Sequence, residues 1–215
     1  MPIDQLLLFI AAGLLLNLTP GPDVVLIVSH ALRSGARAGL VAAAGICAGC
    51  MVHIVAGAVG VSALVAASAS AFTVLKWVGA AYLVYIGVRA LLSRSPAPLD
   101  LPQAGAAPVH ADLRRVFWQG FATNALNPKV ALFFLAFLPQ FIGPQVQDKT
   151  QAFLLLGLLF DLNALWVCAG WALAAAWLAR RVGAVRRSLH WLERVAGAMF
   201  IAFGLNLAFS DNPTR

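Results

Sequence analysis

The sequence predicts an all-α integral membrane protein of six transmembrane helices, arranged as two inverted three-helix repeats in which helices 1 and 4 are broken. Three observations predict this fold: the composition, six apolar segments of spanning length, and the one-sided placement of arginine. Of the 215 residues, 61% are hydrophobic and 11% are charged, whereas soluble domains average about half and about a quarter. So short a chain cannot bury this much apolar surface in one soluble core. The composition therefore excludes a water-soluble globule, a nucleic-acid-binding protein and a disordered chain.

Six segments are long and apolar enough to cross the hydrocarbon core, which takes about 20 residues in a helix. Lipid offers the backbone no hydrogen bonds, so each segment is expected to be helical. The first apolar run has no basic region before it and no small-residue cleavage site after it, so we expect a retained span rather than a signal peptide. The six predicted spans are residues 5–29, 38–67, 71–92, 116–142, 152–179 and 190–209.

The positive charges lie mainly on one side of these spans. Lys129 falls inside a span, and Lys76, Lys149 and Arg215 fall on the opposite side. Loops rich in Lys and Arg usually stay in the cytoplasm. The arginine-rich side is therefore predicted to be cytoplasmic, with both termini outside, and the net charge of +7 reflects orientation rather than a nucleic-acid partner. The arginines of the predicted cytoplasmic side are Arg33, Arg37, Arg89, Arg94, Arg114, Arg115, Arg180, Arg181, Arg186, Arg187 and Arg194.

A linker rich in Pro and Ser at residues 93–114 divides the chain into a first half, 1–92, and a second half, 115–215. Each half holds three predicted spans, and because three is odd, the second half must be inverted relative to the first. A shift of 117 residues also pairs similar positions, for example Gly87 with Gly204. Inverted repeats are a transporter architecture, in which the substrate site lies where the halves meet.

The first span contains a polar motif at membrane depth. Prolines interrupt a helix because they lack a backbone donor, and a carboxylate in mid-membrane costs about 2.5–3.5 kcal/mol on insertion scales. We therefore expect a discontinuous helix beside a polar cavity, with free amides that can hold a substrate carboxylate. Alternatively, Asp23 simply caps the second half-helix. The expected transport residues of this motif are Asn17, Pro20, Gly21, Pro22 and Asp23.

The fourth span repeats this pattern in residues 124–129, where Pro128 again interrupts the helix. Lys129 lies about 20 Å from either end of its span at about 1.5 Å per residue, which is far for its side chain to reach an interface. A partner inside the protein is expected, and Asp23 and Asp161 are the candidates. A purely structural buried ion pair is the alternative. The expected transport residues of this motif are Asn127, Pro128 and Lys129.

Asp161 lies about a third of the way along the fifth span, two residues before Asn163. A carboxylate at this depth is a natural carrier of a coupling proton, so Asp161 joins the expected transport residues. Its alternative role is that of a counter-ion for Lys129.

Cys47 and Cys50 match a Cys-x-x-Cys motif, which invites the interpretation of a membrane thiol electron carrier. The motif lies in mid-span among Gly39, Gly45 and Gly49 and lacks a βαβ context. Small residues at such positions more plausibly allow close helix packing.

No pattern of residues indicates an enzyme or a cofactor. The histidines lack the spacing of metal ligands, and no Gly-rich phosphate loop is present, so ATP is not expected to drive the protein directly. His53, in the second span, is expected to be a hydrogen-bonded packing residue rather than part of a cavity.

Five sequence blocks match one family of membrane proteins in their order and spacing: 20–23, 29–49, 75–83, 127–134 and 137–141. The chain thereby resembles, over nearly its whole length, the lysine exporter superfamily and specifically its homoserine/threonine resistance branch. This resemblance implies a small, proton-driven exporter of amino acids or their derivatives in the bacterial cytoplasmic membrane. It also implies six helices in two inverted halves, with the broken first and fourth helices at the centre.

The favoured substrate is a neutral or hydroxylated amino acid such as threonine or homoserine. Its carboxylate is expected near Gly21 and Pro128 with Lys129 adding positive charge, and its amino group near Asp23 or Asp161. The expected partners are this substrate, a coupling proton and the lipid bilayer, without nucleic acid, and the Gly-rich faces also allow a homodimer. The alternatives are a metal-cation exporter, against which the scarcity of intramembrane carboxylates argues, and the thiol carrier.

Overall fold

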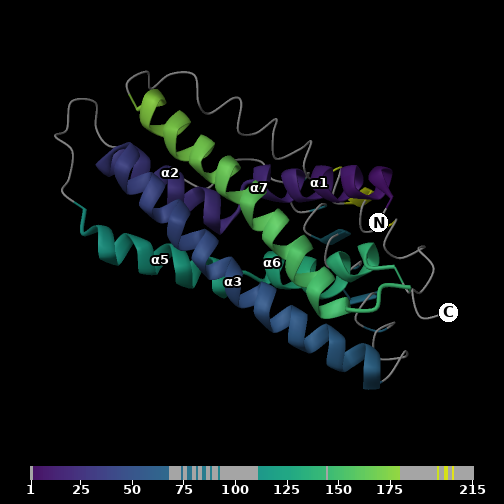
Figure 1. Cartoon of the computed structure of the whole chain (residues 1–215). Coiled ribbons are helices and arrows are strands. Elements are labelled where there is room, and N and C mark those ends of the chain that lie inside the picture. The colour runs from purple at the N-terminus through teal and green to yellow at the C-terminus, as the bar shows by residue number, and fades with distance from the viewer. Residues whose placement is uncertain are drawn as a thin grey trace.

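The computed structural model of the chain describes residues 2–67, 111–143 and 145–179, with single positions between 74 and 92 and between 198 and 205. The predicted features that fall largely outside these residues are the spans 71–92 and 190–209 and the linker 93–114. The described ranges are helical and contain no strand (Figure 1). Their α-helices are α1 (Ile3–Leu18), α2 (Pro22–Ser34), α3 (Ala36–Ala67), α5 (Leu113–Ala125), α6 (Pro128–Leu132) and α7 (Lys149–Leu178).

Four of the predicted spans have counterparts in these helices. In α3, residues Ala36–Gly60 are long and apolar enough to cross a membrane, and so is the whole of α7. The first predicted span is the pair α1 and α2, which bends by 54°, and the fourth is α5 followed by residues Pro128–Phe141, which bends by 44°. The chain is therefore an all-helical membrane protein, and the prediction that its first and fourth spans are broken is confirmed.

The first break follows from its two prolines. Thr19, the residue before Pro20, has an extended backbone at ψ 122°, because a following proline disfavours the helical conformation. Gly21 is also extended, at φ −159° and ψ −172°. Pro22 then starts α2 at the first helical position, where its missing N–H is not needed.

The second break has the same cause and a more irregular continuation. Asn127 is extended at ψ 109° before Pro128, which starts α6. After one turn of α6 the chain passes into a π-helix, η1 (Phe133–Phe137), and then a 3-10 helix, η2 (Leu138–Phe141). Such π segments are rare and often lie at functional sites.

An aromatic cluster fixes the two broken spans against α7. The rings of Phe133 in η1 and Phe160 in α7 have centroids 4.7 Å apart. The ring of Phe9 in α1 meets that of Phe141 in η2 edge-on at 5.2 Å. These side chains are almost completely buried, so α1, η1, η2 and α7 share one hydrophobic core.

Helix α3 packs against both α5 and α7 (Figure 1). Its contact with α5 depends on glycine, because a Cβ atom at Gly45 would collide with the carbonyl of Phe117, and one at Gly49 with that of Phe121. Gly120 on α5 lies equally close to the carbonyl of Ala42. The interpretation of these small residues as packing residues is confirmed.

A valine at Gly45 is therefore expected to force α3 and α5 apart. Overpacking costs about 1–3 kcal/mol, and here the obstacle is backbone that cannot rotate away. We expect a clearly lower melting temperature for the detergent-purified variant, measured by tryptophan fluorescence. Gly60→Val is the matched control on the same helix, because no atom lies within 4 Å of a Cβ placed there. Equal melting temperatures for the two variants would contradict the close α3–α5 contact.

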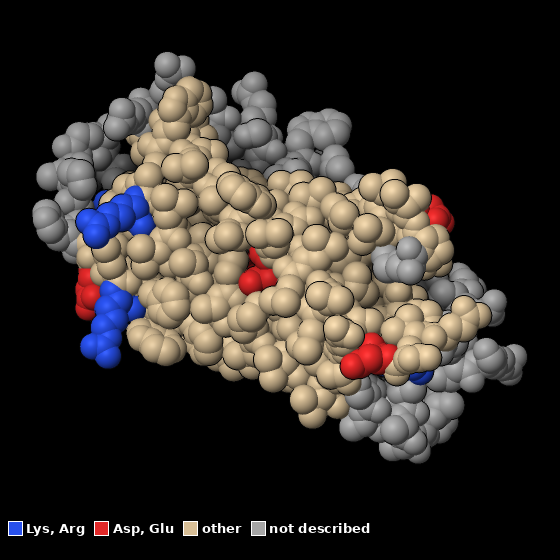
Figure 2. All heavy atoms as spheres, in the orientation of Figure 1, with Lys and Arg blue, Asp and Glu red and all other residues tan. Residues whose placement is uncertain are grey.

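Basic side chains gather at one end of the molecule (Figure 2). This is the end at which α2 finishes and α3 and α5 begin, with Arg33, Arg37, Arg114 and Arg115 in those turns. Lys149 starts α7 at the opposite end. Among the described residues, the basic side chains other than Lys129 thus divide between the two ends as the sequence predicts.

Candidate functional site

The two breaks meet at the centre of the molecule. Asp23, in the first turn of α2, accepts hydrogen bonds on Oδ2 from the side-chain amides of Asn124, at 3.0 Å, and Asn127, at 2.9 Å. Asp23 is the acidic residue of the first turn of α2, where its charge suits the helix N-terminus. Its hydrogen bonds to Asn124 and Asn127 give it a contact beyond its own half-helix. Its carboxylate joins the first broken span to the second.

Lys129 makes the reciprocal connection. Its Nζ donates to the carbonyl of Leu16 at 3.0 Å and to that of Thr19 at 3.3 Å. In an unbroken helix, Leu16 would bond to the amide of residue 20, but Pro20 has no N–H. Lys129 thus satisfies carbonyls that the break in α1 leaves without helical partners, and it places positive charge at the C-terminal end of that helix.

This arrangement corrects the expected partner of Lys129. Neither Asp23 nor Asp161 forms an ion pair with it in the described structure; the backbone at the end of α1 binds its Nζ instead. Asp23 remains close enough for electrostatic attraction. Gly21 lies beside the ammonium: a Cβ at this position would be in van der Waals contact with Nζ, at 3.4 Å.

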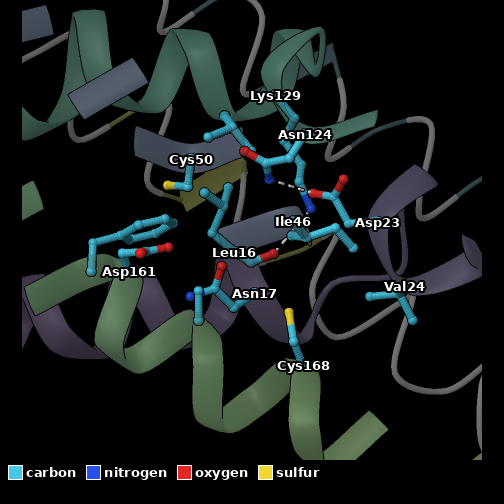
Figure 3. A pocket seen from close by; sticks show the side chains of 13 residues that line it. Leu16, Asn17, Asp23, Val24, Ile46, Cys50, Asn124, Lys129, Asp161 and Cys168 are labelled. Atoms are coloured by element: carbon cyan, nitrogen blue, oxygen red, sulfur yellow. Dashed lines mark hydrogen bonds between the residues drawn. The ribbon is translucent and has the colours of Figure 1, made fainter. Parts of the chain in front are cut away.

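A small cavity of about 20 Å³ lies between the breaks and helices α3 and α7 (Figure 3). Its polar lining comes from six helices, α1, α2, α3, α5, α6 and α7, and its apolar lining includes Leu16 and Phe160. The polar residues and thiols around it are Asn17, Asp23, Cys50, Asn124, Lys129, Asp161 and Cys168. Room for about one water molecule is far too little for an amino acid.

Several buried polar atoms around this cavity lack a hydrogen-bond partner. Within the described structure, five buried side-chain atoms are unpartnered, and four of them belong to cavity residues. Since buried polar groups are nearly always hydrogen-bonded, such a cluster indicates a place prepared for something else to bind. The four atoms are Asn17 Nδ2, Asp23 Oδ1, Asn124 Oδ1 and Asp161 Oδ1.

Asp161 occupies a different part of the cavity from Asp23. Figure 3 shows the two carboxylates on opposite sides of the view. The groups that face Asp161 are the thiols of Cys47 and Cys50, from the neighbouring α3. The cysteines of the described residues are free and buried, and no cluster of His, Cys, Asp or Glu there has a geometry that would hold a metal ion.

The structure brings the sequence-predicted residues together. Asn17, Asp23, Lys129 and Asp161 line the cavity, and Asn127 bonds to Asp23. The prolines and Gly21 form the two breaks themselves. The prediction did not assign a role to Asn124, although it lies three residues before Asn127 in the same motif and this spacing could have indicated it.

His53 does not line the cavity. Its Nε2 donates to the carbonyl of Asn124 at 2.9 Å, and its ring stacks on Phe134. It is buried, as expected of a hydrogen-bonded packing residue, and it holds the end of α5 from outside the cavity.

Comparison with known proteins gives a consistent result. The family model described as LysE type translocator matches residues 14–211. The chain is 35% identical over 208 residues to an uncharacterized membrane protein of Vibrio cholerae, covering 97% of this chain and 98% of that protein. It is 30% identical over 200 residues to the homoserine/homoserine lactone efflux protein of Salmonella typhimurium, covering 93% and 94%. No solved structure matches.

Proposed function

The chain belongs to the family of LysE type translocators, and on that premise we propose that it exports a small amino acid or derivative, driven by the proton gradient. A neutral or hydroxylated compound such as threonine or homoserine is the favoured substrate. The relative named as a homoserine/homoserine lactone efflux protein supports this choice. The observation that carries the proposal is the cavity between two broken spans, lined by unpartnered polar atoms.

The polar atoms of the cavity are complementary to the two ends of an amino acid. Asp23 Oδ1 and Asn124 Oδ1 are free acceptors for an ammonium group. Asn17 Nδ2 is a free donor for a carboxylate. Lys129 Nζ has three protons and donates two hydrogen bonds to the backbone, so one proton remains for the same carboxylate.

This assignment changes one expectation. The half-helix that starts at Pro128 offers a poorer site for the substrate carboxylate, because the amide of Lys129 already donates to the side chain of Asn127 at 3.0 Å. We therefore place the carboxylate at Lys129 Nζ and Asn17. The other half-helix, near Gly21, contributes mainly the space in which Lys129 lies.

Transport requires the halves of the protein to separate. We propose that residues 1–92 and 115–215 form inverted repeats joined by the linker 93–114, and that their relative rocking opens the central site alternately to each side. The volume of the cavity, about 20 Å³, supports a starting point in which the site is too small to admit the substrate. The basic end of the molecule would face the cytoplasm and both termini would lie outside, in a bacterial cytoplasmic membrane.

The test is transport by purified protein in proteoliposomes. Vesicles are preloaded with a panel of labelled amino acids, including threonine, homoserine and homoserine lactone, and a pH gradient is imposed. We expect gradient-dependent movement of one or a few of these compounds. If none moves although correct insertion is verified, the proposal fails.

Gly21→Val tests the position of Lys129. The extended backbone at Gly21 accepts valine. A Cβ there already touches the ammonium at 3.4 Å, so the expected effect arises from the γ-methyl groups beyond it, which displace the ammonium. A misplacement of about 1 Å at a working site can cost on the order of 100-fold, and we expect an initial transport rate at least tenfold lower at equal insertion. Gly143→Val is the control, because a Cβ there meets no atom within 4 Å. If Gly21→Val transports as fast as Gly143→Val, the position of Lys129 does not matter for transport.

A further inference from the structure

We infer that the two carboxylates of the cavity have different tasks: Asp23 binds the substrate ammonium, whereas Asp161 binds and releases the coupling proton. This inference rests on the proposed export of an amino acid and assigns one step of it to each carboxylate. Four features of the described residues support it: the donors on Asp23, the surroundings of Asp161, their shared cavity, and the free oxygen on each.

The surroundings of Asp23 favour its ionised form more than those of Asp161 do. Two amide N–H groups donate to the same oxygen, Oδ2, at 2.9 and 3.0 Å, and both donors are held in place by the second break. Burial of Asp23 disfavours its charge, whereas the nearby cation Lys129 and the two amide hydrogen bonds favour it. A proton on Oδ2 would point toward the amide groups of Asn124 and Asn127 that donate to this oxygen, and would therefore disrupt both hydrogen bonds. A carboxylate that stays charged while its other oxygen is free suits the binding of a cationic group.

Asp161 has the opposite surroundings. The groups that face it are the thiols of Cys47 and Cys50 from α3, and thiols are weak donors that stabilise a charge poorly. On its own helix, Cys168 lies further along the cavity wall, and Asn163 turns away to the carbonyl of Ile10. Its oxygen Oδ1 has no partner.

Among the described residues, groups on the other packed helices do not compensate the charge of Asp161 either. From α1, Asn17 reaches the cavity, but its Nδ2 is itself unpartnered and so does not donate to Asp161. From α6, Lys129 donates to the end of α1. Asp23, from α2, is itself acidic, and Figure 3 shows it on the opposite side of the view from Asp161. A carboxyl without compensating charge at membrane depth is most stable when it carries a proton.

The shared cavity links the two tasks. An ammonium that enters beside Asp23 brings positive charge into a low-dielectric space that also contains Asp161, so it favours release of the proton from Asp161. When the site opens to the cytoplasm, the Asp161 carboxyl gives its proton to water and the substrate binds. When it opens outward, the substrate leaves and a proton from water binds to the carboxylate. Substrate and proton thereby exclude one another, as exchange in opposite directions requires.

The experiment compares Asp161→Asn with Asp23→Asn in proteoliposomes, with labelled threonine and homoserine as substrates. Two reactions are measured: movement driven by a pH gradient, and exchange of labelled for unlabelled substrate without a gradient. Asparagine at 161 keeps the shape of the side chain but cannot release a proton. Because a neutral side chain there also weakens binding of the ammonium, both reactions are measured at saturating substrate concentration. We expect this variant to lose gradient-driven movement at least tenfold while exchange stays within about threefold of wild type. We expect Asp23→Asn to lose both reactions.

Other outcomes overturn the assignment. If Asp161→Asn loses both reactions at normal insertion, or keeps gradient-driven movement, Asp161 is not a separate proton site. If Asp23→Asn keeps exchange, the roles are reversed. If the wild type exchanges neither substrate nor any other compound of the panel, the proposed function fails; if it exchanges another compound, both variants are compared with that compound.

A second measurement uses the wild type and does not depend on folding of a variant. A hydrophobic carbodiimide reacts with protonated carboxyls inside membranes, and mass spectrometry then identifies the labelled residue. We expect labelling of Asp161 that decreases when threonine or homoserine is present, and no labelling of Asp23. Labelling of Asp23 in place of Asp161 would refute the inference, whichever substrate the protein transports.

Discussion

Lys129→Met is expected to destabilise the protein strongly and to abolish transport. Methionine has nearly the same length but cannot donate, so the carbonyls of Leu16 and Thr19 lose the donor that Lys129 supplies beside the break. Each unsatisfied buried polar group costs about 1–3 kcal/mol, and Asp23 also loses the electrostatic attraction of the ammonium. We expect the free energy of unfolding to fall by about 3 kcal/mol, measured in detergent by denaturant titration.

Lys149→Met is the matched control. It removes an ammonium at the start of α7, where a helix N-terminus disfavours positive charge. We expect stability and transport close to wild type. If Lys129→Met unfolds at the same denaturant concentration as this control, the carbonyls at the end of α1 do not depend on Lys129.

Asp23→Asn is expected to fold and insert but to lose transport. The asparagine oxygen can still accept a hydrogen bond from Asn124 or Asn127, which preserves much of the contact between the two breaks. The charge that attracts the substrate ammonium is lost. Truncation of one partner of a buried charged pair costs about 2–5 kcal/mol, which corresponds to a fall in transport rate of roughly 30-fold or more.

The control for this variant is Asp4→Asn, the same chemical change at an exposed position in the first turn of α1. Initial rates are compared at equal amounts of inserted protein, over a range of substrate concentrations. A rate of Asp23→Asn close to that of Asp4→Asn would remove Asp23 from the mechanism. If the rate of Asp23→Asn is low at low substrate concentration but reaches that of Asp4→Asn at saturating substrate, Asp23 acts in substrate binding alone.

The elements that the sequence predicted well share a local cause. The limits of a membrane span depend on apolar length, and a break depends on prolines within that length, so both can be read from a few adjacent residues. This is why the first and fourth spans were expected to be broken, and why the bends of 54° and 44° lie at Pro20–Pro22 and Pro128.

The pairing of the site residues was predicted less well. The sequence indicated that Lys129 needs a partner, and a carboxylate was the natural candidate. It did not indicate that Pro20 leaves the carbonyl of Leu16 without its helical donor at the place that Lys129 reaches. Asn124 was missed as a partner of Asp23 for the same reason. Both contacts join residues more than a hundred positions apart.

The sequence by itself determined that the chain spans a membrane, where two of its spans break, and which charged residues lie within it. These features follow from the transfer cost of each residue and from the missing donor of proline, which are properties of short segments. The tertiary structure alone decided that each break completes the hydrogen bonds of the other, and that Asp23 and Asp161 face different donors. Such pairings depend on how α3 brings α5 and α7 together, because the position of a donor relative to a distant acceptor is set only when helices pack.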